Sequence, residues 1–310
     1  MGTNKKPIDY LHLPRGTVLK NKYLIKDKLV PQSNLSILYK AINSASKEQV
    51  VIKEFFPQGL VLRDLDGKKV VAKNPKGDFL QKEVVLFLQE AKVIQQLQIP
   101  QIGRCYDYFK ANNTAYIVLK YYQGINLEEY IKKECLKFYQ FIDKIFLPLL
   151  KTVAHIHKQG YLHRDLKPAN IIYNQKVVLI DFGSAIKYKK KENKKRVLTP
   201  GYAPLEFHSE STKQGPSSDI YSLAAILYYF LTSQVPLAVK QRIIKDELVP
   251  VAELNPWVSQ GLNDFIMRNL SLNAKYRDQT ILDFRLNLEL ECFKIKSKKI
   301  LNSFVSNFFK

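Results

Sequence analysis

The spacing of apolar residues changes along the chain near residue 124, and this change restricts the fold strongly. Residues 23–51 contain short runs rich in β-branched and aromatic residues, separated by turn formers, which predicts an antiparallel meander. Residues 58–78 are rich in Gly, Asp, Lys and Asn and predict a hairpin or loop insertion. Apolar residues at helical spacing then predict one long helix over residues 78–98, with two further strands before residue 124.

Beyond residue 124 the pattern is mainly helical. The apolar spacing predicts helices over residues 127–133, 138–159, 219–232 and 260–270, and short strands over 171–173 and 177–180. A strand-rich part followed by a helical part predicts an α+β protein with two unequal lobes. The most polar cluster of the chain flanks the two short strands, so we expect the chemistry there.

That cluster contains two motifs. The segment HRDLKPAN ends at Asn170, and the tripeptide DFG begins at Asp181 after the two short strands. Phosphoryl transfer needs a carboxylate that receives the proton of the attacking hydroxyl, which Asp165 can supply, and oxygen ligands for Mg²⁺. Asn170 and Asp181 suit the second task because a hairpin between them brings their oxygens together. Lys167, two residues from the base, can neutralise charge on the moving phosphoryl group.

These motifs resemble those of the eukaryotic-type protein kinase family, over about residues 23–282. The VVIK sequence that ends at Lys53 is similar to the family's VAIK strand, which implies that Lys53 contacts the α- and β-phosphates of ATP. The expected ion-pair partner is Glu90 on the long first-lobe helix, with Glu83 as the second choice. HRDLKPAN favours a serine/threonine kinase that uses Mg²⁺ and ATP. Further nucleotide contacts implied by the resemblance are Leu38, Val51, Leu119, Lys120, Tyr122 and Ile172.

The resemblance extends through the second lobe. The sequence TPGYAPLE from Thr199 to Glu206 is similar to the end of a kinase activation segment, with Arg277 as the expected buried partner of Glu206. Asp219 matches the position whose carboxylate supports the catalytic-loop backbone, and Thr199 is expected to contact that loop. A bacterial branch of the family is indicated by the phrases VVIKEFFP and GYAPLE and by Arg63, Arg242 and Asp246.

One motif departs from the family. The loop that covers the phosphates normally reads GxGxxG, because glycines let backbone amides approach phosphate closely. Here the corresponding positions include Pro31, Ser33 and Ser36 and no glycine. These three residues are the expected loop contacts to the nucleotide, and their bulk predicts weaker ATP binding. Two hypotheses follow: an active kinase with an unusual loop, or a pseudokinase that acts as a scaffold or allosteric binding module.

The charge balance points to acidic partners. Lys and Arg number 49 against 28 Asp and Glu, a formal net charge of +21, which favours phosphates, acidic proteins, nucleic acid or anionic lipid. Seven cations lie between residues 187 and 196, and they are either a solvated loop or a docking surface for acidic protein substrates. No specific nucleic acid is expected, because no recognisable reader module accompanies the charge.

The expected organisation is an N-terminal extension (1–22), a kinase domain (23–290) and a basic amphipathic tail (291–310). The domain divides into an N-lobe (23–119), a hinge (120–124) and a C-lobe (125–290). The tail has apolar residues on one helical face, which suits an anionic membrane surface or packing on the second lobe or a partner. Without a signal peptide, a transmembrane helix or a cysteine metal motif, a cytoplasmic protein is expected, either free or peripheral at a membrane.

Overall fold

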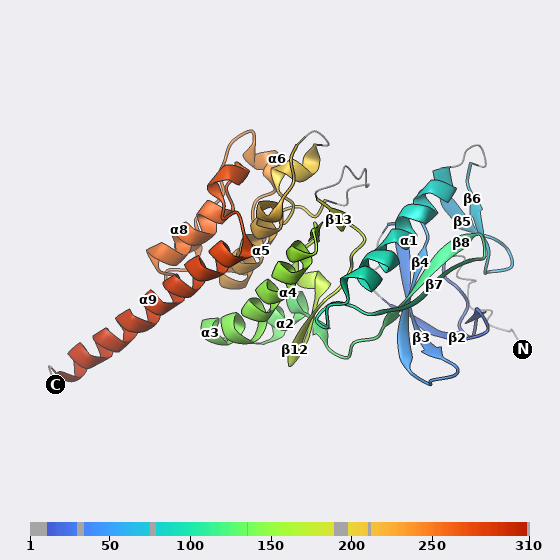
Figure 1. The fold of residues 1–310 in the computed structure, drawn as a ribbon, viewed down its shortest axis with the longest axis horizontal. Helices are drawn as coiled ribbons and strands as arrows, with labels where there is room; N and C mark the ends of the chain where they lie inside the picture. Colours follow the sequence, from blue (N-terminus) through green and yellow to red (C-terminus); the bar gives the residue numbers. More distant parts are fainter. Residues whose placement is uncertain are drawn as a thin grey trace, which may run out of the picture. The chain divides into compact units, whose positions relative to one another are not determined.

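The computed structural model describes residues 11–29, 34–74, 79–134, 136–188, 198–209 and 212–308, without the side chains of 79–80 and 299–308. The chain divides into two compact units (Figure 1). Unit 1 contains residues 1–98 and 103–123, and unit 2 contains residues 99–102 and 124–310. The first is rich in strands and the second in helices, as the apolar pattern predicts.

Unit 1 is built on a six-stranded antiparallel sheet. Its elements are β1 (Val18–Leu19), β2 (Tyr23–Leu29), β3 (Ser36–Asn43), β4 (Gln49–Phe55), β5 (Val61–Arg63), β6 (Val70–Ala72), α1 (Phe79–Leu97), β7 (Cys105–Ala111) and β8 (Thr114–Lys120). The sheet order is β1-β2-β3-β4-β8-β7, and β5 and β6 form a separate hairpin within the predicted insertion.

The two faces of this sheet bury different cores. On one face, Val84, Leu88 and Ala91 of α1 pack with Ala115 and Ile117 of β8. Successive side chains of a strand point to opposite faces of the sheet. On the other face, buried residues of β2, β3, β4 and β8 pack against the N-terminal segment and the β5–β6 hairpin. Burying each large apolar side chain contributes about 1.5–3 kcal/mol. Both faces are therefore covered, one by a helix and one by the hairpin and N-terminal residues.

The folded part of unit 1 begins before residue 23, where the sequence placed the start of the domain. Leu13 and Leu19 are buried in its core, and Val18 and Leu19 pair with β2. The backbone nitrogen of Leu13 donates to the hydroxyl of Tyr39 on β3 at 3.0 Å. The N-terminal segment is thus tied to the sheet by both apolar and polar contacts.

Unit 2 is mainly helical. Its elements are β9 (Ile125–Asn126), α2 (Leu127–Lys133), α3 (Phe138–Phe141), the π-helix η1 (Ile142–Phe146), α4 (Leu147–Lys158), β10 (Tyr161–Leu162), the 3₁₀ helix η2 (Pro168–Asn170), β11 (Ile171–Asn174), β12 (Lys176–Leu179), β13 (Ile186–Lys187), the 3₁₀ helix η3 (Leu205–His208), α5 (Pro216–Thr232), α6 (Val239–Arg242), α7 (Val251–Leu254), α8 (Gln260–Asn269), the 3₁₀ helix η4 (Ala274–Tyr276) and α9 (Ile281–Phe308). Helix α5 lies at the centre, buried along nearly its whole length, and α8 and α9 pack against it.

Two helical predictions differ in detail from the structure. The helix expected over residues 138–159 is interrupted by η1, where the backbone nitrogen of Leu147 donates to Ile142. Pro148 follows, and its missing N–H disfavours regular α-helical bonding at this point. At the C-terminus, α9 runs unbroken from Ile281 across the predicted boundary at residue 290. The predicted tail is therefore continuous with a helix that begins before residue 290, the predicted end of the preceding domain.

Candidate active site

One buried carboxylate holds the loop between β10 and η2. Asp219, in the first turn of α5, accepts hydrogen bonds from the backbone nitrogens of His163 and Arg164, each at 2.9 Å. Arg164 has a left-handed φ of 67°, uncommon for a residue with a side chain, and these bonds stabilise it. Burial opposes ionisation of Asp219, but the hydrogen bond from His157, the nearby His157 and His163 rings and the bond from the Arg164 backbone together outweigh it and hold the pKa of Asp219 below its ordinary value. A charged Asp219 thus supports the loop backbone, as the resemblance implied.

His157 and His163 are two histidines to which the sequence assigned no role. Nε2 of His157 on α4 lies 2.8 Å from Oδ2 of Asp219. The signal for His157 was its place in the last turn of an apolar helix directly before the HRD loop. Burial lowers the pKa of His163, so its ring is neutral and Nδ1 accepts from the backbone nitrogen of Asp165 at 3.3 Å. The same ring packs edge-to-face against Phe182 of the DFG tripeptide, with centroids 4.7 Å apart.

The carboxylate of Asp165 is fixed by three side chains. The Thr199 hydroxyl donates to Oδ1 at 2.7 Å, and the Asn170 amide donates to Oδ2 at 2.9 Å. The Lys167 ammonium donates to the two carboxylate oxygens at 3.1 and 2.8 Å and to the Thr199 hydroxyl at 2.9 Å. This arrangement presents an oriented carboxylate beside a cation, which is what a base in phosphoryl transfer needs.

The two predicted magnesium ligands lie at the ends of one hairpin. Strands β11 and β12 pair from Ile171 with Leu179, and the backbone nitrogen of Ile180 donates to the Asn170 carbonyl at 2.9 Å. Asp181 follows, with a left-handed φ of 63°, and its Oδ1 accepts from the nitrogen of Gly183 at 3.2 Å. The hairpin therefore brings the backbone of Asn170 next to the residue before Asp181.

The donor set fits Mg²⁺. The amide nitrogen of Asn170 already donates to the side chain and backbone oxygens of Asp165, which leaves the amide oxygen for a cation. Mg²⁺ is held by one or two protein oxygens, with water and phosphate completing its shell. Among the described residues, no group of three or more His, Cys, Asp or Glu could hold a metal. A cation at Asn170 and Asp181 would therefore depend on phosphate oxygens.

Unit 1 carries the predicted phosphate clamp. Lys53 on β4 and Glu90 on α1 form an ion pair, with Nζ 2.8 Å from Oε2. Their side chains are 13% and 2% exposed, so solvent screens this pair less than a surface pair. The structure thus pairs Lys53 with Glu90, the first choice of the sequence analysis, which holds the ammonium in a defined position.

The predicted adenine contacts in unit 1 share the sheet face of Lys53. Leu38 lies opposite Lys53 in the β3–β4 register, and Val51 lies opposite Leu119 in the β4–β8 register. Because side chains alternate along a strand, Val51 and Lys53 point to the same face. These three apolar side chains are half-buried. They form an apolar surface next to the cation.

The other residues predicted to contact the nucleotide do not belong to this apolar surface. Lys120 ends β8, and its Nζ lies 5.5 Å from the centre of the Tyr122 ring. Ile172 lies on β11 of unit 2, opposite Val178. Ser36 is the first residue of β3 and is buried. Pro31, Ser33 and the cations of residues 189–196 lie outside the described residues, so the roles predicted for them stay predictions.

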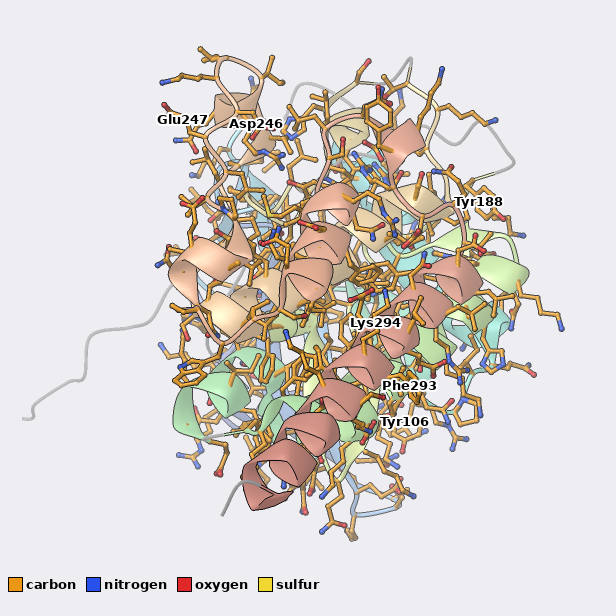
Figure 2. All side chains as sticks on the ribbon, turned by 90° about the vertical axis from the view of Figure 1, so that its left-hand side faces the viewer. Tyr106, Tyr188, Asp246, Glu247, Phe293 and Lys294 are labelled. Carbon is orange, nitrogen blue, oxygen red and sulfur yellow. The ribbon has the colours of Figure 1, made fainter. Side chains whose placement is uncertain are left out.

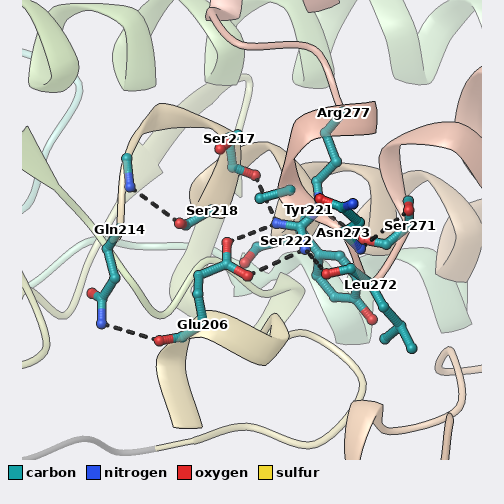
Figure 3. A network of polar contacts seen from close by, with 12 residues as sticks. Glu206, Gln214, Ser217, Ser218, Tyr221, Ser222, Ser271, Leu272, Asn273 and Arg277 are labelled. Carbon is teal, nitrogen blue, oxygen red and sulfur yellow. Dashed lines mark hydrogen bonds and ion pairs between the residues drawn. The ribbon is translucent and has the colours of Figure 1, made fainter. Parts of the chain in front are cut away.

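A second buried ion pair anchors the end of the segment from Thr199 to Glu206. The Arg277 guanidinium donates to both oxygens of Glu206, at 2.7 and 3.2 Å (Figure 3). It also donates to the backbone oxygens of Ser217, Ser271 and Leu272 at 3.2, 2.8 and 3.1 Å. The predicted pair of Glu206 and Arg277 is therefore formed and ties η3 to α5 and to the loop after α8.

These features together define a class of protein. The parts of a protein kinase include an oriented carboxylate beside a lysine, an Asn/Asp pair on a hairpin and a Lys–Glu pair in a strand-rich unit. The sequence matches the protein kinase domain over residues 32–281. The chain therefore belongs to the protein kinase family, which confirms the resemblance.

Relatives and solved structures agree with this assignment. The chain is 28% identical to a probable serine/threonine-protein kinase of Clostridium acetobutylicum over 294 residues, covering 88% of this chain and 41% of the relative. It is 27% identical to the serine/threonine-protein kinase PknD of Chlamydia trachomatis, covering 84% and 31%. The chain thus spans less than half the length of these relatives. The structure titled PpkA-294 apo form matches with a TM-score of 0.74 and 28% identity, covering 90% of this chain and 99% of that one. The predicted α+β kinase fold is confirmed.

Proposed function

We propose that this chain is an active serine/threonine protein kinase that transfers the γ-phosphoryl group of ATP to protein hydroxyls. The observation that carries this proposal is the Asp165 carboxylate held jointly by Lys167, Thr199 and Asn170. A protein that used the fold only as a scaffold would not need this set of polar groups together. The relatives named above are serine/threonine kinases, and none of them favours the pseudokinase hypothesis.

Each group has a defined task in this mechanism. Asp165 accepts the proton of the attacking Ser or Thr hydroxyl, and Thr199 keeps the carboxylate turned toward it. Lys167 offsets negative charge next to the base. Lys53, held by Glu90, binds the α- and β-phosphates.

The cation belongs to the same proposal. Asn170 and Asp181 would hold Mg²⁺, which when bound neutralises phosphate charge and orients the γ-phosphoryl group. The half-buried side chains Leu38, Val51 and Leu119 would contact the adenine. The loop without glycines has fewer ways to bring backbone amides to the phosphates, so a high KM for ATP is expected rather than loss of turnover.

Two further parts of the proposal concern the protein substrate and the location in the cell. A net charge of +21 favours acidic protein substrates through long-range attraction that falls with salt. Among the described residues, no helix has the length and apolar content needed to cross a bilayer. A cytoplasmic location, with the C-terminal tail as an optional contact to anionic lipid, remains the expectation.

Transfer from γ-labelled ATP tests the proposal directly. Wild type, Asp165→Asn and the control Asp264→Asn, an exposed aspartate of α8, are incubated with magnesium or manganese and an acidic or a basic protein. We expect incorporation by the wild type and the control and a loss of about a thousandfold or more in Asp165→Asn, in keeping with loss of an essential base.

Absence of incorporation in all three proteins, with binding of ATP or a partner retained, would refute the enzyme and support the pseudokinase. Equal incorporation in Asp165→Asn and wild type would show that another residue or a contaminant carries the activity. Preference for the basic substrate at low salt would refute the acidic-substrate part alone.

A further inference from the structure

Two cations face each other at one end of the sheet in unit 1. The register of β7 and β8 pairs Cys105 with Leu119. One residue further along, Arg104 therefore lies opposite Lys120, and the backbone nitrogen of Lys120 donates to the Arg104 carbonyl at 2.8 Å. Side chains directly opposite in an antiparallel pair share one face, with Cβ atoms about 4.5–5.5 Å apart, and like charges there are destabilising. The two strands thus hold two positive charges close together at a cost in stability.

Neither of these charges is neutralised by a carboxylate of the described part of the chain. Within that part, no ion pair and no side-chain hydrogen bond involves the Arg104 guanidinium or the Lys120 ammonium, and both residues are exposed. By contrast, Nζ of Lys20, in the same unit, lies 2.9 Å from Oδ2 of Asp107. The N–H donors of Arg104 and Lys120 are therefore available to an anion.

Two tyrosine rings hold the cations in place. The guanidinium carbon of Arg104 lies 5.4 Å from the centre of the Tyr106 ring, and Nζ of Lys120 lies 5.5 Å from the centre of the Tyr122 ring. The Tyr122 hydroxyl accepts from the backbone nitrogen of Arg104 at 3.2 Å. Both rings are half-buried, and Tyr106, which Figure 2 labels, packs against the core of unit 1. These four residues form one ordered group, called here the cationic patch: Arg104, Tyr106, Lys120 and Tyr122.

The cationic patch lies on the face of the sheet away from the predicted adenine contacts. Successive side chains of β8 point to opposite faces, so the Lys120 side chain points away from the face that carries Leu119 and Val51. A ligand on the patch would leave that apolar surface free for a nucleotide. Any contact of Lys120 with adenine would then come from its backbone.

We propose that the cationic patch binds a carboxylate-rich segment of an acidic protein substrate, with one carboxylate between Arg104 and Lys120. A guanidinium can donate two parallel N–H bonds to a carboxylate, and an ammonium can donate a further one. An anion between the two cations also offsets their mutual repulsion, so the bound state regains what the free protein loses. The identity of the segment as part of a substrate rests on the proposed function, whereas the binding itself does not.

The geometry of the patch favours an acidic peptide over a nucleic acid. Proteins bind single strands largely by stacking bases on open aromatic faces. In the patch, each ring is half-buried and has a cation of its own over one face, which leaves little open face for a base. An acidic peptide needs only the two cations.

Fluorescence anisotropy of a labelled octaglutamate peptide, with the 310-residue protein and no ATP, tests the binding at about 0.1 M salt. Arg104→Glu should raise the dissociation constant about tenfold, because it replaces an attraction by a repulsion, and Arg104→Gln should raise it about threefold. The control is Lys110→Glu, an exposed lysine near the other end of β7 that changes the net charge as much as Arg104→Glu does.

The control should raise the dissociation constant less than about twofold. Residue 110 lies about 20 Å from residue 104 along the strand, and charges are screened over about 10 Å at this salt concentration. Because the replaced side chains are exposed, the thermal midpoints of all three variants should match that of the wild type.

Steady-state kinetics tests the role in substrate binding. With the acidic protein of the transfer assay, Arg104→Glu should raise KM about tenfold and leave kcat unchanged, because it removes binding that is equal in the ground state and the transition state. With the basic protein of that assay, the wild type and Arg104→Glu should have the same kcat, and KM should not rise.

Equal octaglutamate binding by the wild type and Arg104→Glu would overturn the proposal. An equal loss in Lys110→Glu would also overturn it, since binding would then follow the net charge alone. Tighter binding of a single-stranded octathymidylate that Arg104→Glu weakens would assign the patch to nucleic acid. Octaglutamate binding that depends on Arg104, with no change in KM, would refute the substrate role. No phosphoryl transfer by any variant, with that binding retained, would refute the proposed function and still support the patch as a site for an acidic partner.

Discussion

Replacement of Arg63 by Met tests a buried charge cluster of unit 1. The Arg63 guanidinium donates to both oxygens of Glu54, at 2.8 and 2.7 Å, and both side chains are fully buried. Hydroxyls of Tyr39 and Tyr116 donate to the same carboxylate at 2.9 and 2.8 Å. Burial and the nearby carboxylate raise the pKa of both tyrosines, so they remain protonated donors.

The expected cost follows from these contacts. Methionine keeps the unbranched stem of Arg63 but removes the guanidinium, whose central carbon lies 4.6 Å from the centre of the Phe56 ring. It therefore leaves the Glu54 charge buried without its cation. Breaking a buried ion pair from one side costs about 3–5 kcal/mol. Because two tyrosine donors remain on the carboxylate, we expect the lower end, about 3 kcal/mol of unfolding free energy. Glu54→Gln in the Arg63→Met background should recover part of this loss, since no charge is then left buried.

Hydrogen exchange of the backbone amides of β3, β4 and β8 measures this free energy for unit 1 alone, which matters in a chain with two units. The control is Arg285→Met on α9, whose guanidinium is half exposed and pairs with Glu289, with an expected cost below about 0.5 kcal/mol. A loss below about 1 kcal/mol in Arg63→Met, or a double variant no more stable than the single one, would refute the assignment of the energy to a buried unpaired charge.

Three further outcomes are expected in unit 2. Thr199→Val should lower kcat about tenfold or more, because the buried Asp165 carboxylate loses a hydrogen-bond donor. Thr199→Ser should retain that donor and the kcat of the wild type, and neither variant should change the thermal midpoint. The folded-state pKa of Asp219 is below its ordinary value, so its contribution to stability is complete above about pH 4 and is lost as pH falls through that lower pKa. Urea unfolding between about pH 5 and pH 2 should show this part of the pH dependence in the wild type and not in Asp219→Asn. Gly201→Ala should destabilise the protein by about 1–3 kcal/mol, measured by thermal unfolding. The φ of Gly201 is +80°, and the added Cβ would meet Val235 and lie 2.6 Å from the Pro236 carbonyl oxygen. The control Gly160→Ala also has a φ of +80° but open space around the added Cβ, so it should cost only the backbone strain.

The fold was predictable because its main signals are local. The helix of residues 78–98 follows from an apolar period of 3.6, and its observed bounds differ by one residue at each end. The strands of unit 1 follow from short runs of β-branched and aromatic residues. The start of α9 was not predicted, because its apolar residues lie on two sides of the helix and blur a single amphipathic period: Phe284 and Leu288 are buried, whereas Leu282 and Leu286 are exposed. The burial of Leu13 depends on contacts with β3, and no local sequence pattern predicts such a contact.

The candidate site was predictable where a motif specifies both residue type and spacing. Asp165, Asn170 and Asp181 were found in this way, and the hairpin that brings them together follows from two short apolar runs. His157 was not found, because its place in the last turn of the helix before the HRD loop does not identify its partner, Asp219, which lies 62 residues away. Polar pairs between residues far apart in the sequence do not affect the spacing of apolar residues, so only a family motif or the structure reveals them.

The strand β4 shows why the polar insertion after it belongs to the folded unit. Lys53 and Glu54 are adjacent, and strand geometry sends their side chains to opposite faces of the sheet. Lys53 meets Glu90 from α1, whereas Glu54 meets Arg63 from the β5–β6 hairpin. Each of two consecutive charges therefore requires its own counter-ion from a different element. The hairpin neutralises the charge next to Lys53, the lysine proposed to bind phosphate, and its removal would leave a buried carboxylate in the strand that positions that lysine.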